Sequence, residues 1–382
     1  IKDGKIELVA NALITQLDES VYDTVINVYG KQVYPGFIAP NSTLGLVEIE
    51  AVRATDDKSE VGYFNPHIRS AIAYNVDSEV IPTVRSNGVL LAQITPRSGR
   101  ISGTSSVMTL DGLTWEDAMY RRDDGIHINW PRMFYPGWWN EDGIVTRNSD
   151  YAKEAENLIA YLKKAKAYAE TDHETTDLAM EAMRGLFDGS KRLFVHADFV
   201  KELEDIIAIK KELGIEHLVI VGGHDAWMVA ELLKDRNIPV MLRRVHSLPM
   251  RAEEPVDLPY RLPSILQEAG VLFCLENSGD MEAMGTRNLP FYAGTAMAYG
   301  LSEEEAIASI TLNTAKILGI DHKTGSIEQG KDANLVVSEG DALDVTGNEI
   351  VLAMIRGEFV DLDNKQKELY RKYMELYGLE EE

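Results

Sequence analysis

The chain has 382 residues, of which 45% are hydrophobic and 26% charged, proportions that fit one large globular domain with a smaller one. Its 38 basic and 62 acidic residues give a net charge of −24, and a negative field of this size repels phosphate backbones and anionic lipid, so neither nucleic acid nor a membrane surface is an expected partner. The single cysteine, Cys274, excludes an internal disulfide, and no apolar run approaches the roughly 18 residues that a membrane span needs.

Residues 1–35 are predicted to be β-structure. Residues 5–9 and 24–28 are short runs rich in β-branched side chains, and polar turn residues separate them. Residues 1–6 are typical of a hairpin with an Asp-Gly turn. A protein rarely begins inside a hairpin, so we expect a longer chain before Ile1, and the compartment, cytoplasm or periplasm, stays open.

Two buried strands are expected next, one entered through the turn at residues 35–38 and one at residues 87–96. Residues 98–106 are rich in glycine, serine and threonine, which predicts a loop. Its backbone N–H groups and hydroxyls would suit a carboxylate or a peptide-like substrate, with Arg97 and Arg100 as charge partners. A flexible connection explains the same composition.

Residues 130–139 carry three tryptophans, a phenylalanine and a tyrosine among prolines and glycine. Bulky rings in such a loop predict a pocket lid, a contact between copies of the chain in a homo-oligomer, or a small core under the loop itself. We favour the small core.

From about residue 190 the pattern becomes regular. Strands are expected at residues 192–196, 218–221, 239–242 and 271–275, and helices at residues 199–213, 227–233 and 262–268. Continuous apolar strands that alternate with amphipathic helices indicate a parallel sheet with both faces covered. The number of repeats favours a closed (β/α)8 TIM barrel over an open sheet.

After two helices, at residues 289–299 and 303–318, the pattern returns to short strands and ends in a charged helix at residues 365–379. The predicted fold class is therefore α/β, a (β/α)8 TIM barrel with a small β-sandwich domain built from both chain ends. The predicted divisions are residues 1–35 and 321–362 for the two parts of the incomplete sandwich, 36–320 for the barrel and 363–382 for the C-terminal helix.

Three segments resemble the amidohydrolase superfamily. They are residues 35–38 (Pro-Gly-Phe-Ile); residues 301–306 (Leu-Ser-Glu-Glu-Glu-Ala) running into 311–319 (Thr-Leu-Asn-Thr-Ala-Lys-Ile-Leu-Gly); and residues 325–337 (Gly-Ser-Ile-Glu-Gln-Gly-Lys-Asp-Ala-Asn-Leu-Val-Val). The order and spacing of the last two are highly specific, and the resemblance covers essentially the whole chain. It is strongest to the imidazolonepropionase-related branch, and it implies a metal-dependent hydrolase barrel with a composite β-sandwich.

The resemblance also implies where a metal would bind, and several of the matching positions differ from the family. Members follow the Pro-Gly-Phe-Ile segment with Asp-x-His-x-His, and here the two histidine positions are Asn41 and Thr43, neither of which is a good zinc ligand. The strand 5 histidine is kept as His196, whereas the strand 6 histidine falls on Gly222.

The strand 8 aspartate, which serves the family as general base, falls on Asn277 or Ser278, with Glu276 and Asp280 beside it. With so few ligands retained, a dinuclear centre is not expected. The expected cofactor is none, or a single zinc-like divalent ion that contacts His196.

Three histidines, His196, His224 and His246, follow three successive predicted strands, so their side chains could converge at the barrel mouth. In the one-metal hypothesis His196 and His224 are the ligands, with Glu276 or Asp280 as a further ligand or as the base. His246 is a candidate substrate-binding residue. Each histidine also has an ordinary structural explanation: a bond to the barrel wall, a place at a helix start, or packing in a loop.

The first functional hypothesis is therefore an amidohydrolase-like hydrolase with a reduced or altered metal site that acts on a non-peptide or small-peptide C–N bond. The second is a catalytically silent relative that binds a small molecule or partners an active paralogue. A third is a metal-free enzyme in which His196 works with Glu276 or Asp280 as acid–base groups.

Overall fold

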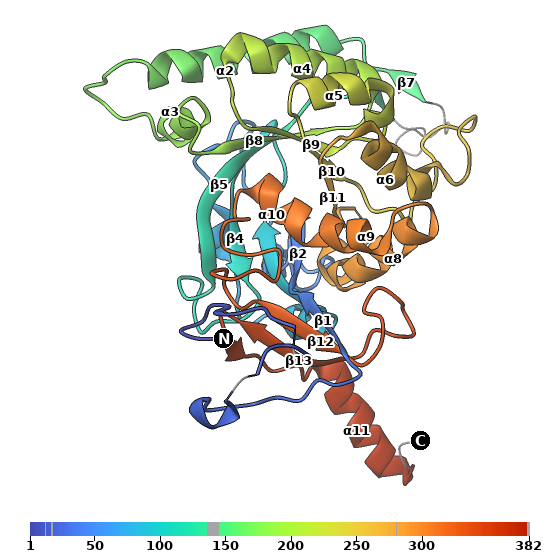
Figure 1. Ribbon diagram of the computed structural model, residues 1–382. Helices are drawn as coiled ribbons and strands as arrows, with labels where there is room; N and C mark the ends of the chain where they lie inside the picture. The colour runs from blue at the N-terminus through green and yellow to red at the C-terminus, as the bar shows by residue number, and fades with distance from the viewer. Residues whose placement is uncertain (12, 17, 136–144, 280, 380–382) are drawn as a thin grey trace.

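The computed structural model describes residues 1–382 except for residues 12, 17, 136–144, 280 and 380–382. An eight-stranded sheet forms a nearly closed barrel at its centre (Figure 1). Its strands are β2 (Phe37–Ser42), β3 (Val89–Ile94), β4 (Ile101–Thr109), β5 (Met119–Asn129), β8 (Arg192–Ala197), β9 (Leu218–Gly222), β10 (Val240–Leu242) and β11 (Phe273–Leu275). They lie in the spatial order β11-β10-β9-β8-β5-β4-β3-β2, which confirms the predicted α/β barrel.

Side chains close the barrel between its first and last strands. Asn41, near the end of β2, donates from Nδ2 to Oε2 of Glu276, directly after β11, at 3.3 Å. In the described part of the chain no backbone ladder joins β2 to β11. The closing contact therefore lies among the residues at the barrel mouth.

One strand runs against the direction of the others. β4 is antiparallel to both β3 and β5, whereas the remaining neighbours pair in parallel. A tight turn at Ser98 and Gly99, with φ of 75° and 66°, joins β3 to β4 without a crossover helix. The loop predicted for residues 98–106 is wrong for most of its length, because β4 is buried throughout. Small hydroxyl side chains are suited to this buried strand because hydrogen-bond partners lie inside the barrel. Ser105, for example, donates to Asp124.

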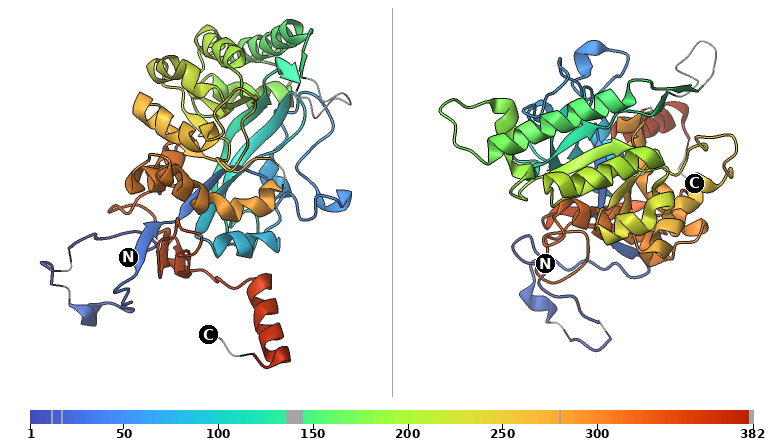
Figure 2. Two further views of the ribbon diagram at one scale, coloured as in Figure 1. Left: turned by 90° about the vertical axis from the view of Figure 1, so that its right-hand side faces the viewer. Right: turned by 90° about the horizontal axis from the view of Figure 1, so that it is seen from above.

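Helices cover the outside of the parallel strands. They are α1 (Val80–Arg85), α2 (Tyr151–Ala169), α3 (Leu178–Met183), α4 (Val200–Leu213), α5 (Ala230–Asp235), α6 (Leu258–Ala269), α7 (Glu282–Gly285), α8 (Leu289–Ala298), α9 (Glu303–Ile310) and α10 (Leu312–Leu318). In Figure 2 the green and yellow helices form a layer over one face of the strands. None in the described part of the chain has both the length and the apolar character needed to cross a membrane.

Helix α4 illustrates how local sequence sets these elements. Leu203 and Ile206 are fully buried and lie three residues apart, so they share the face that meets the sheet. Glu202 accepts a hydrogen bond from the backbone N–H of Phe199 at 3.3 Å, which satisfies a free donor at the helix start. Gly214, with φ of 70°, ends the helix in the left-handed conformation that glycine favours.

A second sheet is built from both ends of the chain, as predicted. It contains β1 (Gln32–Pro35), β12 (Leu335–Ser338), β13 (Ile350–Ile355) and β14 (Glu358–Phe359) in that order, all antiparallel. The predicted final helix is present as α11 (Lys365–Tyr377), which projects from this sheet (Figure 1). A separate two-stranded ribbon pairs β6 (Phe134–Tyr135) with β7 (Thr146–Arg147).

The strands predicted at residues 5–9 and 24–28 are wrong. The first segment forms only isolated bridges at Lys5, and the second has no regular structure. Most of their apolar side chains, such as Val9 and Val25, are exposed, and Ile6 alone among them is buried. A β-branched run forms a stable strand only where a neighbouring strand and a core cover it, and here neither does.

Gly125 of β5 provides a test of the packing behind the barrel mouth. A Cβ at this position would lie 2.4 Å from Cε2 of Phe194 and 2.6 Å from the Arg192 carbonyl oxygen. Because Phe194 is fully buried, we expect Gly125→Ala to lower the free energy of unfolding by about 1–3 kcal/mol through overpacking. Urea unfolding measures this change, and a loss below about 0.5 kcal/mol would contradict the tight packing.

Candidate active site

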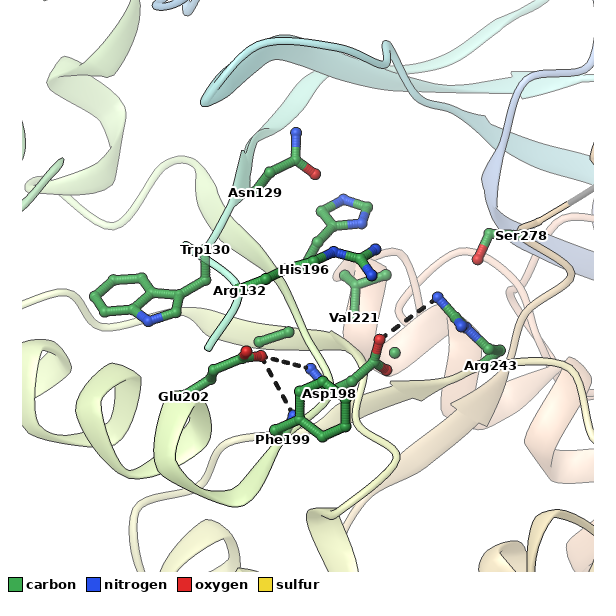
Figure 3. A pocket seen from close by; sticks show the side chains of 12 residues that line it. Asn129, Trp130, Arg132, His196, Asp198, Phe199, Glu202, Val221, Arg243 and Ser278 are labelled. Atoms are coloured by element: carbon green, nitrogen blue, oxygen red, sulfur yellow. Dashed lines mark hydrogen bonds and ion pairs between the residues drawn. The ribbon is translucent and has the colours of Figure 1, made fainter. Parts of the chain in front are cut away.

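The barrel mouth holds a polar pocket of about 120 Å³ (Figure 3). Its side chains come from the carboxyl ends of β5, β8 and β9 and from residues that follow β10 and β11, the end at which barrel enzymes place their chemistry. The lining residues are Asn129, Trp130, Arg132, His196, Ala197, Asp198, Phe199, Glu202, Val221, Gly222, Arg243 and Ser278. Among the positions singled out from the sequence, the pocket thus brings together His196, Gly222 and Ser278.

His196 points into this pocket from β8 and is held by a second histidine. Its Nε2 lies 3.0 Å from Nδ1 of His127 on β5, and the ring of His127 stacks on Phe194 with centroids 4.5 Å apart. Burial, together with the charges of Arg97 and Arg243, lowers the pKa of His196 to about 3. Burial also lowers the pKa of His127. Both imidazoles are therefore neutral near pH 7.

The sequence analysis missed His127. The signal was present, because Ile126 and Ile128 alternate with His127 and Asn129 along β5, and such alternation puts both polar side chains on one face. His127 lies behind His196 and is fully buried.

A chain of hydrogen bonds continues from His127 into the barrel interior. Nε2 of His127 lies 3.0 Å from Oγ of Ser105, and this hydroxyl lies 2.7 Å from Oδ1 of Asp124. Gln93 donates from Nε2 to Oδ2 of Asp124 at 2.7 Å and accepts from the backbone N–H of Asn41 at 3.0 Å. All these groups are buried, so the chain connects the histidine pair to β2 without solvent.

A guanidinium group lies at the end of β2, beside the first replaced ligand position. Arg97 donates to Oδ1 of Asn41 at 2.9 Å and to the Asn41 carbonyl at 2.8 Å, and it pairs with both carboxylate oxygens of Glu282 at 3.1 Å. Glu276 accepts a hydrogen bond from Nδ2 of Asn41 and a second one, at 2.7 Å, from the hydroxyl of Ser278. Burial raises the pKa of Glu276, while bonds from Ser278 and the charges of Arg243 and Arg97 oppose this rise.

Two further pocket residues, Asp198 and Arg243, were not candidates from the sequence. Arg243 Nη2 lies 3.5 Å from Asp198 Oδ2, a loose ion pair that Figure 3 marks across the pocket. Among the described residues, Asp198 Oδ1 and Arg243 Nε are buried atoms without a hydrogen-bond partner. Such atoms raise the free energy of the folded state by about 1–3 kcal/mol each unless a ligand or water satisfies them.

His224 is engaged elsewhere. Its Nε2 lies 2.9 Å from Glu254, and the described residues contain one set of three acidic or imidazole groups within 4.8 Å of one another: His224, Asp225 and Glu254. Arg251 donates to both carboxylates of this set. The arginine supplies positive charge where a metal would bring it, and so offsets part of the charge of the two carboxylates.

The remaining candidates lie around the pocket or away from it. His246 is exposed and its Nε2 contacts the Thr295 hydroxyl at 2.7 Å. Arg100 pairs with Glu154 at 3.0 Å and does not line the pocket. Asn277 accepts from the Tyr292 hydroxyl and donates to the Glu282 carbonyl, so Glu276, and not Asn277, meets Asn41.

Two predictions fall on residues outside the described part of the chain. One is the role of Asp280 as a ligand or base, and the other is the rest of the aromatic segment, residues 136–139. Trp130, from the described part of that segment, is buried, donates from Nε1 to the Tyr151 hydroxyl at 3.1 Å and lines the polar pocket, so both the small core and the pocket lid stay predictions.

Comparison with known proteins gives the family. The model of the amidohydrolase family matches residues 147–364, more than half of the chain. The chain belongs to the amidohydrolase family. Amidohydrolase tasK from Hapsidospora irregularis is 21% identical over 383 residues, a match that covers 88% of this chain and 38% of that protein. Imidazolonepropionase from Symbiobacterium thermophilum is 30% identical over 149 residues, or 37% of this chain and 32% of that protein.

These matches span about a third of the length of the curated relatives. Among solved structures, an amidohydrolase from Thermotoga maritima MSB8 superimposes with a TM-score of 0.82, 26% identity and 94% coverage of each chain. A Xaa-Pro dipeptidase with bound methionine has a TM-score of 0.57 at 14% identity, with 94% of each chain covered, and so shares the fold.

The side chains at the positions where the resemblance places metal ligands do not fit a divalent ion. The carboxamide of Asn41 is bonded to the guanidinium of Arg97, so a cation already occupies this corner of the mouth. Thr43 offers only a hydroxyl, and Gly222 has no side chain. The retained imidazole, His196, has one nitrogen committed to its histidine partner. Zinc sites need three or four imidazole, thiolate or carboxylate ligands, and this set supplies too few.

Proposed function

We propose that the protein hydrolyses a C–N bond of a small amide at the polar pocket and that it does so without the family's divalent ion. Membership of the amidohydrolase family supports the reaction class. One observation carries the rest: Arg243 lines the pocket together with His196, at the strand ends where the resemblance places a metal. A fixed guanidinium group supplies positive charge of the kind that stabilises a developing oxyanion.

The pocket offers a donor and an acceptor for this reaction. Arg243 Nε, buried and without a partner among the described residues, donates to the amide oxygen as negative charge builds up on it. Asp198 Oδ1 takes the proton from the attacking water as the water oxygen bonds to the carbonyl carbon. The C–N bond then breaks, and the leaving nitrogen takes that proton from Asp198.

The experiment is an assay of amine release from a panel of N-acyl amino acids, dipeptides, lactams and simple alkyl amides. We expect at least one class to be hydrolysed and Arg243→Gln to lower kcat/KM on the order of 10²-fold, the usual cost of losing one oxyanion donor. Wild-type activity unchanged in the variant would contradict the role of Arg243. Glu231→Gln, an exposed residue of α5 that lines neither the polar pocket nor the cavity beside it, is the control.

The metal-free site makes a separate prediction. We expect purified protein to contain well under one zinc, manganese or iron per chain by mass spectrometry, and its activity to survive treatment with a chelator, because the donor set is too small to retain an ion. Activity that disappears on chelation and returns with zinc would contradict this half of the proposal.

A second candidate function is binding without catalysis. The hydrogen bond from His196 to His127 favours it, because the His196 imidazole is neutral, half-buried and already bonded at Nε2. Amides that bind to the pocket but release no amine across the whole panel would support this alternative.

A further inference from the structure

A second and larger cavity opens beside the polar pocket. Its volume is about 750 Å³, within the range of small-molecule sites. It shares Arg132, Asp198, Phe199 and Arg243 with the polar pocket, so the two hollows adjoin at these side chains. A substituent on a ligand in the polar pocket therefore has this cavity beside it.

The walls of the larger cavity are mostly apolar. The apolar lining residues are Met133, Phe134, Val145, Phe199, Val200, Met228, Met250 and Ala252. Phe134 meets Phe199 edge to face at 6.2 Å between ring centroids, but Phe134 and Met228 remain 38% and 44% exposed. Exposed rings and thioethers around one hollow are the usual surface for an apolar ligand, because covering them removes apolar area from water.

The junction of the two spaces is polar. Asp198 and Arg243 stand there, each with one buried atom that has no partner in the described part of the chain. The carbonyl oxygen of an amide is an acceptor for Arg243 Nε, and the water that attacks the amide is a donor to Asp198 Oδ1, so amide and water together match this pair of atoms. An apolar group attached to that amide would then point into the larger cavity.

We infer that the larger cavity is the binding site for an apolar group of the substrate, a hydrocarbon chain or ring joined to the amide held at Asp198 and Arg243. This inference rests on the proposed function for the identity of the reacting group. It defines the substrate class as amides with a sizeable apolar substituent, in contrast to small polar amides.

The test measures the affinity of wild-type protein for the N-methylamides of acetic, butanoic, hexanoic and octanoic acids by calorimetry. We expect affinity to rise by roughly three- to fourfold per methylene until the cavity is filled. Affinity that is flat along this series would overturn the inference.

Two matched variants test whether the dependence of affinity on chain length arises in the larger cavity. Met228→Gln places an amide in the cavity wall and should weaken binding of the octanoyl amide by about fivefold while leaving the acetyl amide unchanged. Leu232→Gln is the control, because Leu232 is 45% exposed, close to the value for Met228, and does not line the cavity. Equal losses in both variants would overturn the assignment of the cavity.

The two proposals fail in different ways. Affinity that rises with chain length, without release of methylamine, leaves the apolar site standing and contradicts hydrolysis of these amides. Hydrolysis with no dependence of affinity or KM on chain length leaves the proposed reaction standing and contradicts the apolar site.

Discussion

Replacing Arg97 with methionine is expected to lower the free energy of unfolding by about 3–5 kcal/mol, the loss typical of breaking a buried ion pair from one side. Arg97 forms a forked pair with Glu282, and the exposed fractions of the two side chains are 19% and 10%. It also supports Glu276, which is fully buried. Without the guanidinium group Glu282 loses its ion-pair partner, and Glu276 loses one of the two arginine charges that act on it.

This loss should depend on pH. Burial already raises the pKa of Glu276, and Arg97 is one of the groups that oppose the rise. In Arg97→Met the pKa of Glu276 rises further, so the folded protein binds a proton that the unfolded protein has released. Stability is then retained at low pH and falls as pH rises through the raised pKa. Urea unfolding at pH 5 and pH 8 should therefore show the larger loss at pH 8.

Arg69→Met is the matched control. Arg69 pairs with Asp123 at 2.8 Å, but the exposed fractions are 32% and 24%, so solvent screens this pair more. We expect a loss of about 1 kcal/mol or less and little change with pH. Equal losses for the two variants would contradict the view that Arg97 neutralises buried charge at the barrel mouth.

The second half of the barrel was predictable because its signals are local. Strand β9 and helix α4, for example, each show the hydrophobic period of their own structure within a few residues. Strand β4 was not predictable in this way. Its serines and threonines resemble a loop until Asp124, on the next strand, is known to face them. A composition rule fails where a polar partner lies inside the core.

The candidate site also contains some features that the sequence predicts and others that only the fold reveals. His196 was found because it ends a strand and matches a family position, and the loss of histidine at Asn41 was visible at once. Arg97 was proposed as a substrate group, but the structure bonds it to Asn41 and Glu282. Nothing in the spacing along the chain places a residue after β3 against one in α7, so only the fold reveals this pair.

The hydrogen-bond chain behind His196 fixes which of its nitrogens carries the proton. Gln93 accepts from the Asn41 N–H, so its amide nitrogen must donate to Asp124. Burial raises the pKa of Asp124, while the bonds from Ser105 and Gln93 and the charge of Arg121 oppose this rise and favour the carboxylate. Ser105 donates to the ionised carboxylate and accepts from Nε2–H of His127. Nδ1 of His127 then accepts from Nε2–H of His196. Nδ1 of His196 is left as the basic nitrogen.

Asp124→Asn should reverse the donor and acceptor roles along this chain of hydrogen bonds and so change which nitrogen of His196 is protonated. The carbonyl of the introduced carboxamide must face the donor of Gln93, so its NH₂ group faces Ser105 and donates to it. Ser105 then donates to His127, His127 donates from Nδ1–H to His196, and the proton of His196 moves to Nδ1.

Nitrogen NMR of the histidine rings distinguishes the two tautomers directly, and Asp198→Asn, which is not in the chain of hydrogen bonds, is the control. We expect the Nε2–H tautomer of His196 in wild type and in the control, and the Nδ1–H tautomer in Asp124→Asn. The same His196 tautomer in wild type and Asp124→Asn would show that this chain does not set the proton position at the barrel mouth.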